Sequence, residues 1–225
     1  MRKVLSTFIA FLALIAFSLT ASAIGHDQKN KQMDQVSDLF IGFIDEAFSD
    51  VDALEVKNSQ GKDVTKQFIK QAQPFFNKKD YKSIQNIITE YDLQVSYEER
   101  TDVKFEDADE FASDATRMRS IRKYFYVNTQ ALDADISKEW IVTLTGEIYY
   151  DDQTNTITSV SSPVLSLEET DYELMLSPYI DSIRTASKHS KDVATFSGMY
   201  TMKAKAGQKE YIFGSHVHSF SSEID

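Results

Sequence analysis

The stretch that decides the fold is residues 138–167, which read KEWIVTLTGEIYYDDQTNTITSVSSPVLSL. From 140 to 150 two sets of side chains alternate, and this period of two is typical of a strand with one buried face. Residues 151–155 are types that tight turns favour, and residues 156–167 are expected to return as the paired strand. The stretch therefore predicts a long antiparallel hairpin.

The N-terminal third carries helical patterns. Residues 27–49 place apolar side chains, three phenylalanines among them, at steps of three and four. This face is expected to dock on the protein's own sheet, with a partner or lipid surface as the alternative; the acidic opposite face disfavours membrane adsorption. Asp63 and Asp80 are expected to cap two further helices, and Pro74 to break or bend the first of them.

After Asp92 the period changes from helical to strand-like. Strands are expected at 93–97, 117–130 and 180–188, and a last pair within 194–220 turns at 206–209. The fold class is therefore predicted as α+β, with N-terminal helices (24–91) packed on a curved antiparallel β-sheet or sandwich formed by the C-terminal two-thirds (92–225). Residues 24–225 are expected to form one compact unit.

Two four-residue segments echo each other. Residues 143–146 read TLTG and residues 195–198 read TFSG, each inside a predicted long strand. A glycine within a strand often marks a bulge, a bend, or the close approach of a neighbouring backbone or ring. Two similarly curved hairpins are expected in one system of sheets.

The first 23 residues have the three parts of a secretory signal peptide. Residues 1–3 are basic, 4–19 are apolar and 21–23 read Ala-Ser-Ala, a small-residue cleavage site. The apolar run is short for a membrane span, although an uncleaved N-terminal anchor is the alternative. We expect a mature chain that begins at Ile24, is secreted, and has no stable membrane anchor after cleavage.

Net charge and cysteine content indicate which partners and which kind of exporting cell are favoured. Removing Arg2 and Lys3 leaves 22 basic and 35 acidic residues, a formal charge of −13. Such a surface repels nucleic acid and anionic membranes, and it favours solubility or a basic partner. The chain has no cysteine, whereas secreted eukaryotic domains commonly carry disulfides, so a bacterial exporter is favoured.

His216 and His218 are the most suggestive pair for chemistry. Residues two apart on a strand point the same way, so both imidazoles are able to meet one zinc or copper ion. Further ligands would come from His26, His189 or a carboxylate. The pair is therefore a candidate metal site.

The local pattern favours a plainer interpretation of that strand. Tyr211, Phe213 and Val217 look like its buried face. Both histidines are then expected to point outward, beside Ile212 and Phe220.

Acidic side chains crowd residues 98–114, and 151–155 carries three more calcium-type ligands. Calcium prefers several oxygen ligands, but the EF-hand spacing and its glycine are absent from 98–114. Turns also favour aspartate and asparagine for their own reasons. Solvated charge is the preferred interpretation of both segments.

No catalytic or cofactor motif is present: no G-x-S-x-G, P-loop, dinucleotide fingerprint or H-E-x-x-H. The chain is rich in aromatic residues, and Tyr124, Tyr126, Tyr149 and Tyr150 are expected to pack across strands or to offer a binding face. We expect a secreted, non-enzymatic protein that binds a protein, peptide or envelope polymer. The alternatives are an envelope hydrolase with an unrecognised carboxylate pair and a metal-binding protein.

Overall fold

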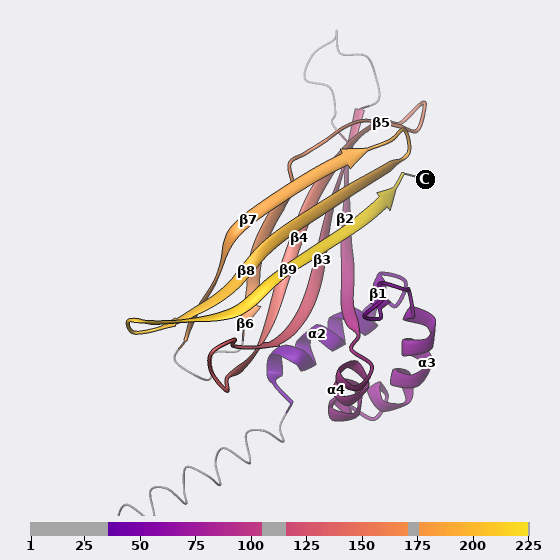
Figure 1. The fold of residues 1–225 in the computed structure, drawn as a ribbon. Coiled ribbons are helices and arrows are strands. Elements are labelled where there is room, and N and C mark those ends of the chain that lie inside the picture. The colour runs from indigo at the N-terminus through magenta and orange to yellow at the C-terminus, as the bar shows by residue number, and fades with distance from the viewer. Residues whose placement is uncertain (1–35, 105–115, 171–175, 225) are drawn as a thin grey trace, which may run out of the picture. The chain divides into compact units, whose positions relative to one another are not determined.

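The computed structural model describes residues 36–104, 116–170 and 176–224, and Ser37–Asp225 cluster as one compact unit. Helices lie in the N-terminal part and antiparallel sheets make up most of the rest (Figure 1), so the predicted α+β class is confirmed. The elements are α2 (Asp38–Ser49), β1 (Leu54–Lys57), α3 (Thr65–Phe76), α4 (Tyr81–Glu90), β2 (Gln94–Lys104), β3 (Thr116–Gln130), β4 (Ser137–Asp151), β5 (Thr156–Val160), β6 (Val164–Thr170), β7 (Ser177–His189), β8 (Val193–Ala206) and β9 (Lys209–Glu223).

The strands form two antiparallel sheets. The first has the order β1-β2-β3-β4-β5, with β6 also paired to β4, and the second has the order β7-β8-β9. In the view of Figure 1 the second sheet lies in front of β3 and β4. Most neighbouring strands follow one another in the sequence as hairpins, whereas α3 and α4 lie between β1 and β2, and β6 returns to pair with β4.

The predicted long hairpin is present, but its returning strand is in two parts. Both β5 and β6 pair with β4, and residues 161–163 separate them. Pro163 has no N–H to give to a ladder. Ser161 instead accepts a hydrogen bond from the Glu147 N–H through its hydroxyl (2.9 Å) and donates its own N–H to the Glu147 carbonyl (2.9 Å). The interruption was not visible from the period alone.

One apolar core lies between the two sheets. It takes alternate side chains from β4 and β8, as the period of two predicts, and the indole of Trp140 meets the Phe213 ring edge-on at 5.3 Å. Its largest members are Trp140, Tyr200, Phe196, Phe213, Ile121 and Leu144. Contributions from both sheets to one cluster mean that the sheets pack face to face.

The two echoed glycines explain how closely the sheets approach. A Cβ on Gly146 would lie 2.5 Å from the Phe196 ring, and a Cβ on Gly198 would lie 2.4 Å from Leu165 and 3.2 Å from Leu144. Each T-x-[TS]-G segment thus supplies a large side chain to the glycine of the other, Phe196 to Gly146 and Leu144 to Gly198. Of the three features that a strand glycine often marks, the close approach of a neighbouring side chain is the one found at both positions.

Helix α2 packs on the other face of the first sheet. The Phe40 and Phe43 rings lie 5.1 and 5.5 Å from the ring of Tyr126 on β3. Ser37 caps the helix by accepting from the Phe40 N–H (3.0 Å), and its hydroxyl also bonds Glu139 of β4. The phenylalanine stripe therefore docks on the protein's own sheet, as predicted.

The next two helices agree with the sequence in part. Asp80 caps α4 through the Ser83 N–H (3.1 Å), as predicted. Asp63 was wrongly placed as the cap of α3: the N-cap is Val64, and the Asp63 carboxylate accepts from the Thr65 N–H (2.8 Å) in the turn before it. Helix α3 continues through Pro74, so this residue does not break it. The short strand β1 was not predicted.

Several predicted segments lie outside the described residues: the signal peptide 1–23, the helical pattern at 27–35, and most of the acidic segment (105–114). None of the described helices is both long enough and apolar enough to cross a membrane.

Candidate functional site

A bulge in β9 decides where the two histidines point. Met202 pairs with Gly214 and Lys203 with Ile212, which leaves Phe213 as an extra residue in β9. Gly214 has a φ of +105°, a conformation that suits glycine at a bulge. The extra residue reverses the alternation of faces, so even-numbered side chains beyond it face the core.

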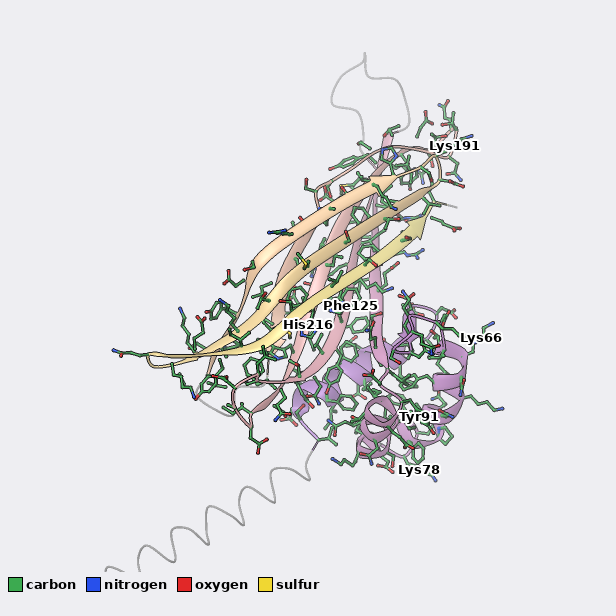
Figure 2. All side chains as sticks on the ribbon, viewed as in Figure 1. Lys66, Lys78, Tyr91, Phe125, Lys191 and His216 are labelled. Atoms are coloured by element: carbon green, nitrogen blue, oxygen red, sulfur yellow. The ribbon has the colours of Figure 1, made fainter. Side chains whose placement is uncertain are left out.

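The predicted outward orientation of the histidines is therefore wrong. Val217 is 66% exposed and Phe220 is 3% exposed, the reverse of the expected pattern, while Phe213 is buried as expected. His216 and His218 lie on the inner face with Phe220. Figure 2 labels His216 on β9 and Phe125 on β3, which line one groove between the two sheets. The period of two holds on each side of the bulge but not across it.

His218 is held between the two sheets. Its ring stacks on Phe125 with centroids 4.1 Å apart, and its Nε2 lies 2.9 Å from the Tyr200 hydroxyl. Burial, together with the smaller effect of the neighbouring His216, lowers the pKa of His218 to about 4. His218 is therefore neutral at physiological pH and serves as a hydrogen-bonding group.

His216 lies two residues before His218 on the same face of β9. Its ring centroid is 5.8 Å from that of Tyr200. Burial lowers its pKa, although a hydrogen bond with the backbone of Phe213 opposes this. Its Nε2 is buried and has no hydrogen-bond partner among the described residues. Trp140 Nε1 and Ser222 Oγ share this status among the described residues, and an ordered water is a common partner of such buried atoms.

The structure tests only part of the metal hypothesis. Both imidazoles share one face, as spacing requires, but His218 Nε2 is already engaged with Tyr200. His189 ends β7 opposite Ala194, four to six positions along β8 from the partners of the other two histidines. His26 lies outside the described residues. Within the described ranges no group of three or more histidine or acidic residues is placed to hold a metal ion.

A groove opens beside these histidines. It has a volume of about 490 Å³, and residues from both sheets line it. They are Glu55, Lys57, Gly61, Asp92, Leu93, Gln94, Val95, Ser96, Phe125, Tyr126, Val127, Asn128, His216, Val217, His218 and Ser219. A second groove of about 530 Å³ shares Glu55 and is lined by Asp50, Asp52, Ala53, Leu54, Glu55, Glu98, Arg100, Lys123 and Ser221.

The grooves exist because the first sheet is wider than the second. Strand β9 lies over β3, through His218 on Phe125 and Lys123 near the Phe220 ring. In register, Ser96 pairs with Phe125, Glu98 with Lys123 and Arg100 with Ile121, and paired residues share a face. We call the side chains of β1 and β2 on that face the ledge: Glu55, Lys57, Gln94, Ser96, Glu98, Arg100 and Asp102.

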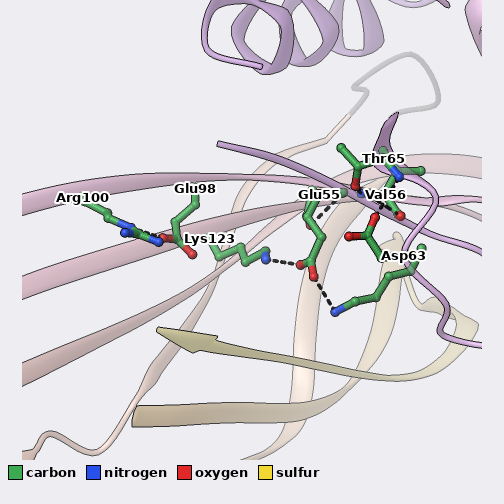
Figure 3. Close-up of polar contacts among 9 residues, drawn as sticks. Glu55, Val56, Asp63, Thr65, Glu98, Arg100 and Lys123 are labelled. Carbon is green, nitrogen blue, oxygen red and sulfur yellow. Dashed lines mark hydrogen bonds and ion pairs between the residues drawn. The ribbon is translucent and has the colours of Figure 1, made fainter. Parts of the chain in front are cut away.

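The cations in this region are paired with the protein's own carboxylates. Lys123, only 5% exposed, bonds Glu55, and Lys57 lies 2.8 Å from the same carboxylate. Arg100 pairs with Glu98 (Figure 3). Burial alone would raise the pKa of Glu55, but the hydrogen bonds from both lysines outweigh it and the pKa is lowered.

The two grooves carry an excess of negative charge. Five carboxylates and three cations line them, which leaves a formal charge of −2 at neutral pH. The carboxylates are Asp50, Asp52, Glu55, Asp92 and Glu98, and the cations are Lys57, Arg100 and Lys123. The arrangement favours a neutral or cationic ligand.

Four carboxylates of the two acidic segments have local partners. Glu99 accepts from the Tyr124 hydroxyl (2.9 Å), and Asp102 pairs with Arg119 at 2.7 Å. Asp151 accepts two N–H bonds within its own turn, and Asp152 pairs with Arg117. This agrees with turn chemistry and local pairing for 151–155.

The predicted tyrosine face is mostly packing. Tyr150 is in the core and Tyr126 lies under α2. Tyr124 stacks on Tyr97 with centroids 4.6 Å apart, and Tyr149 donates to Glu147 (2.9 Å). Cross-strand packing, one of the two interpretations drawn from the sequence, therefore accounts for them.

Sequence reasoning missed Lys123 and Glu55. A signal for Lys123 exists, since it lies midway between Ile121 and Phe125 on the buried face of β3. Nothing local points to Glu55, because the strand that holds it was not predicted. A glycine two residues before His216 was the available sign of a bulge.

Comparison of the chain with protein-family models, curated proteins and solved structures finds no match.

Proposed function

We propose that this protein is exported and works by binding a protein, peptide or envelope polymer in the two grooves beside β9. The observation that carries the proposal is the groove of about 490 Å³, in whose wall the imidazoles of His216 and His218 lie beside apolar side chains. Ligand sites are concave and place a few polar groups among apolar walls. Phe125 and Val127 supply apolar wall here, and His216 supplies the polar group.

The side-chain arrangement supports binding over acyl transfer. Acyl transfer by serine requires an imidazole bonded to a nucleophile and oriented by a further group. His218 bonds Tyr200, and within the described residues neither imidazole bonds a serine, threonine or carboxylate side chain. Both pKa values are lowered, which keeps the pair neutral and suits hydrogen bonding to a ligand.

We also propose that the two sheets form a curved sandwich in which the second sheet leaves the ledge of the first uncovered. The second sheet covers β3 to β6 and leaves the ledge open. Because Gly146 and Gly198 permit close packing of the sheets, the walls of the grooves are held by a rigid core. A pre-formed site of this kind limits the entropy lost on binding.

The test uses the secreted chain labelled with ¹³C and ¹⁵N at histidine. Mass spectrometry of the culture medium is expected to give a chain that begins at Ile24; finding only full-length protein in the cytoplasm would overturn the export proposal. Peptide mixtures and envelope polymer fractions are then titrated in. Shifts of the His216 and His218 imidazoles with an unchanged His189 are expected. Shifts at His189 alone, or none, would overturn the proposed site.

Metal binding is the second candidate, favoured by the same free Nε2 of His216. It requires equimolar zinc or copper in the dialysed protein, lost when both His216 and His218 become alanine. The hydrolase hypothesis has no assigned carboxylate pair, and it requires the release of product from an envelope polymer.

A further inference from the structure

Strand β9 has an open edge beside the grooves. The Ile224 N–H bonds Asp192 on the β8 side (3.1 Å), whereas the Glu223 carbonyl points away from β8 and accepts from Arg119 (3.1 Å). Because backbone groups alternate along a strand, odd-numbered residues from 215 to 221 direct their N–H and C=O away from β8. Within the described residues these groups have no backbone partner.

This edge lacks the usual protection of an edge strand. Exposed edges are normally blunted by charge, proline or a bulge. Residues 98–104 on the outer edge of β2 read EERTDVK, and β7 has Pro178 and a bulge between Asp181 and Arg184. Residues 215–221 of β9 read SHVHSFS, without charge or proline, and Val217 is 66% exposed. Its bulge lies before this stretch, at Gly214.

The space beside the open edge fits one more strand. Seven residues of β9 span roughly 20 Å, and a paired strand would lie about 4.8 Å away. That position is above the ledge, where the two grooves lie along Val217, Ser219 and Ser221. Side chains on one face of an added strand would contact the ledge. Those on the other face would lie on the outer surface of the second sheet, next to Val217 and its cross-strand partner Met199.

We propose that an extended basic peptide segment adds to β9 as a fourth strand of the second sheet, with its basic side chains directed to the carboxylates of the two grooves. This rests on the proposed function and names its ligand class. Backbone hydrogen bonds to residues 215–221 give affinity, and pockets for alternate side chains give specificity, as in other cases of strand addition.

Charge decides between a basic peptide and a second copy of the chain. Each ledge cation is already paired with a carboxylate, while the grooves keep a net charge of −2. Asp50, Asp52 and Asp92 line the grooves and have no cation partner among the ion pairs of the described residues. Lysine or arginine at alternate positions of the peptide is expected to pair with them. A second copy of the mature chain carries the same formal charge of −13 and is repelled.

The probe is an eight-residue peptide that alternates lysine with valine or threonine, and its control replaces lysine by glutamate. Two further analogues carry N-methyl groups, one on the lysine amides and one on the others. Because alternate amides face opposite edges of a strand, only one of the two is expected to lose tenfold or more in affinity. The glutamate peptide is expected to bind at least tenfold more weakly.

A matched pair of variants tests the protein side. Val217→Pro removes an outward N–H that β8 does not use, and Val217→Thr keeps it. The proline variant is expected to lose tenfold or more in peptide affinity, and the threonine variant less than twofold. If the proline variant does not fold, the N-methyl analogues still decide the question. Amide exchange at Ser215, Val217, Ser219 and Ser221 is expected to slow when the peptide binds.

The outcomes separate this inference from the proposed function. Equal affinity of both N-methyl analogues, with shifts at His216 and His218, overturns strand addition but keeps the groove as the site. If the edge amides already exchange slowly without peptide, and their exchange slows further as protein concentration rises, a second copy of the chain covers the edge. That result overturns the proposal. If an envelope polymer binds and the peptide does not, the basic peptide is the wrong ligand, while the proposed binding function stands. No binding of any kind overturns both.

Discussion

Gly146 and Gly198 hold positions where a methyl group has no room. A Cβ on Gly146 would lie 2.5 Å from the Phe196 ring, which is itself fully buried. Forcing extra volume into a packed core costs about 1–3 kcal/mol. This lack of space explains why β4 and β8, both rich in strand-forming residues, each contain a glycine at this position.

We predict that Gly146→Ala destabilises the fold by about 1–3 kcal/mol in urea unfolding. Gly42→Ala in α2 is the matched control, because nothing lies within 4 Å of its added Cβ. It is expected to raise the free energy of unfolding by up to about 1 kcal/mol, since alanine suits a helix better than glycine. A Gly146→Ala variant as stable as the control would contradict the close packing.

The pKa of His218 predicts a stability that depends on pH. Burial lowers this pKa from 6.5 to about 4, so the unfolded chain binds a proton that the folded chain does not between these values. The stabilising contribution is therefore complete above about pH 6.5 and is lost as pH falls toward 4. It amounts to about 3 kcal/mol, and His216 acts in the same direction.

We predict that urea midpoints of the wild-type chain fall between pH 7 and pH 4.5, and that His218→Asn removes more than half of the fall. His189→Asn is the control, since His189 is exposed, and it is expected to keep the full pH dependence. If His218→Asn keeps it as well, His218 is not buried in the neutral form.

At the scale of elements, the bulge at Gly214 places the side chains of His216 and His218 on the inner face of β9, where they form part of the groove wall. A φ of +105° is easy for glycine and costs about 1–3 kcal/mol for other residues. Without the extra residue, His216 and His218 would face solvent and Val217 would face the core. The predicted histidine orientation failed for this reason alone.

We predict that Gly214→Ala lowers the free energy of unfolding by about 1–3 kcal/mol and raises the pKa of His218 toward its ordinary value, measured by NMR. Gly61→Ala is the control: Gly61 also has a positive φ (+75°), but it lies in a turn before α3. It is expected to destabilise without moving the His218 pKa. A raised pKa in both variants would indicate general loosening.

Much of the element structure was predictable from the sequence. The hairpin, the last strand pair and the stripe of α2 followed from side-chain periodicity, which reports burial of one face. The split of the returning strand depends on Ser161 bonding Glu147, and the position of β1 depends on pairing with β2. Such contacts join residues far apart in the sequence, so no local pattern encodes them.

At the scale of the whole molecule, the candidate site follows from a mismatch between the sheets. The first sheet extends past β9 by β1 and β2, and the ledge so exposed carries paired charges rather than an apolar surface. The sequence predicted a sheet system and an acidic surface, with solubility or a basic partner as the two interpretations of its charge. It did not reveal which strand would be left at an open edge, because strand order is a property of the assembled fold.

The most direct test of the open edge is residue-resolved amide hydrogen exchange along β9 in the free protein. We predict alternation: the amides of His216, His218 and Phe220, which pair toward β8, exchange slowly, and those of Ser215, Val217, Ser219 and Ser221 exchange fast. Uniform protection from 215 to 221 would show that the edge is already covered. The reverse alternation would show that the bulge and the facing of both histidines are wrong.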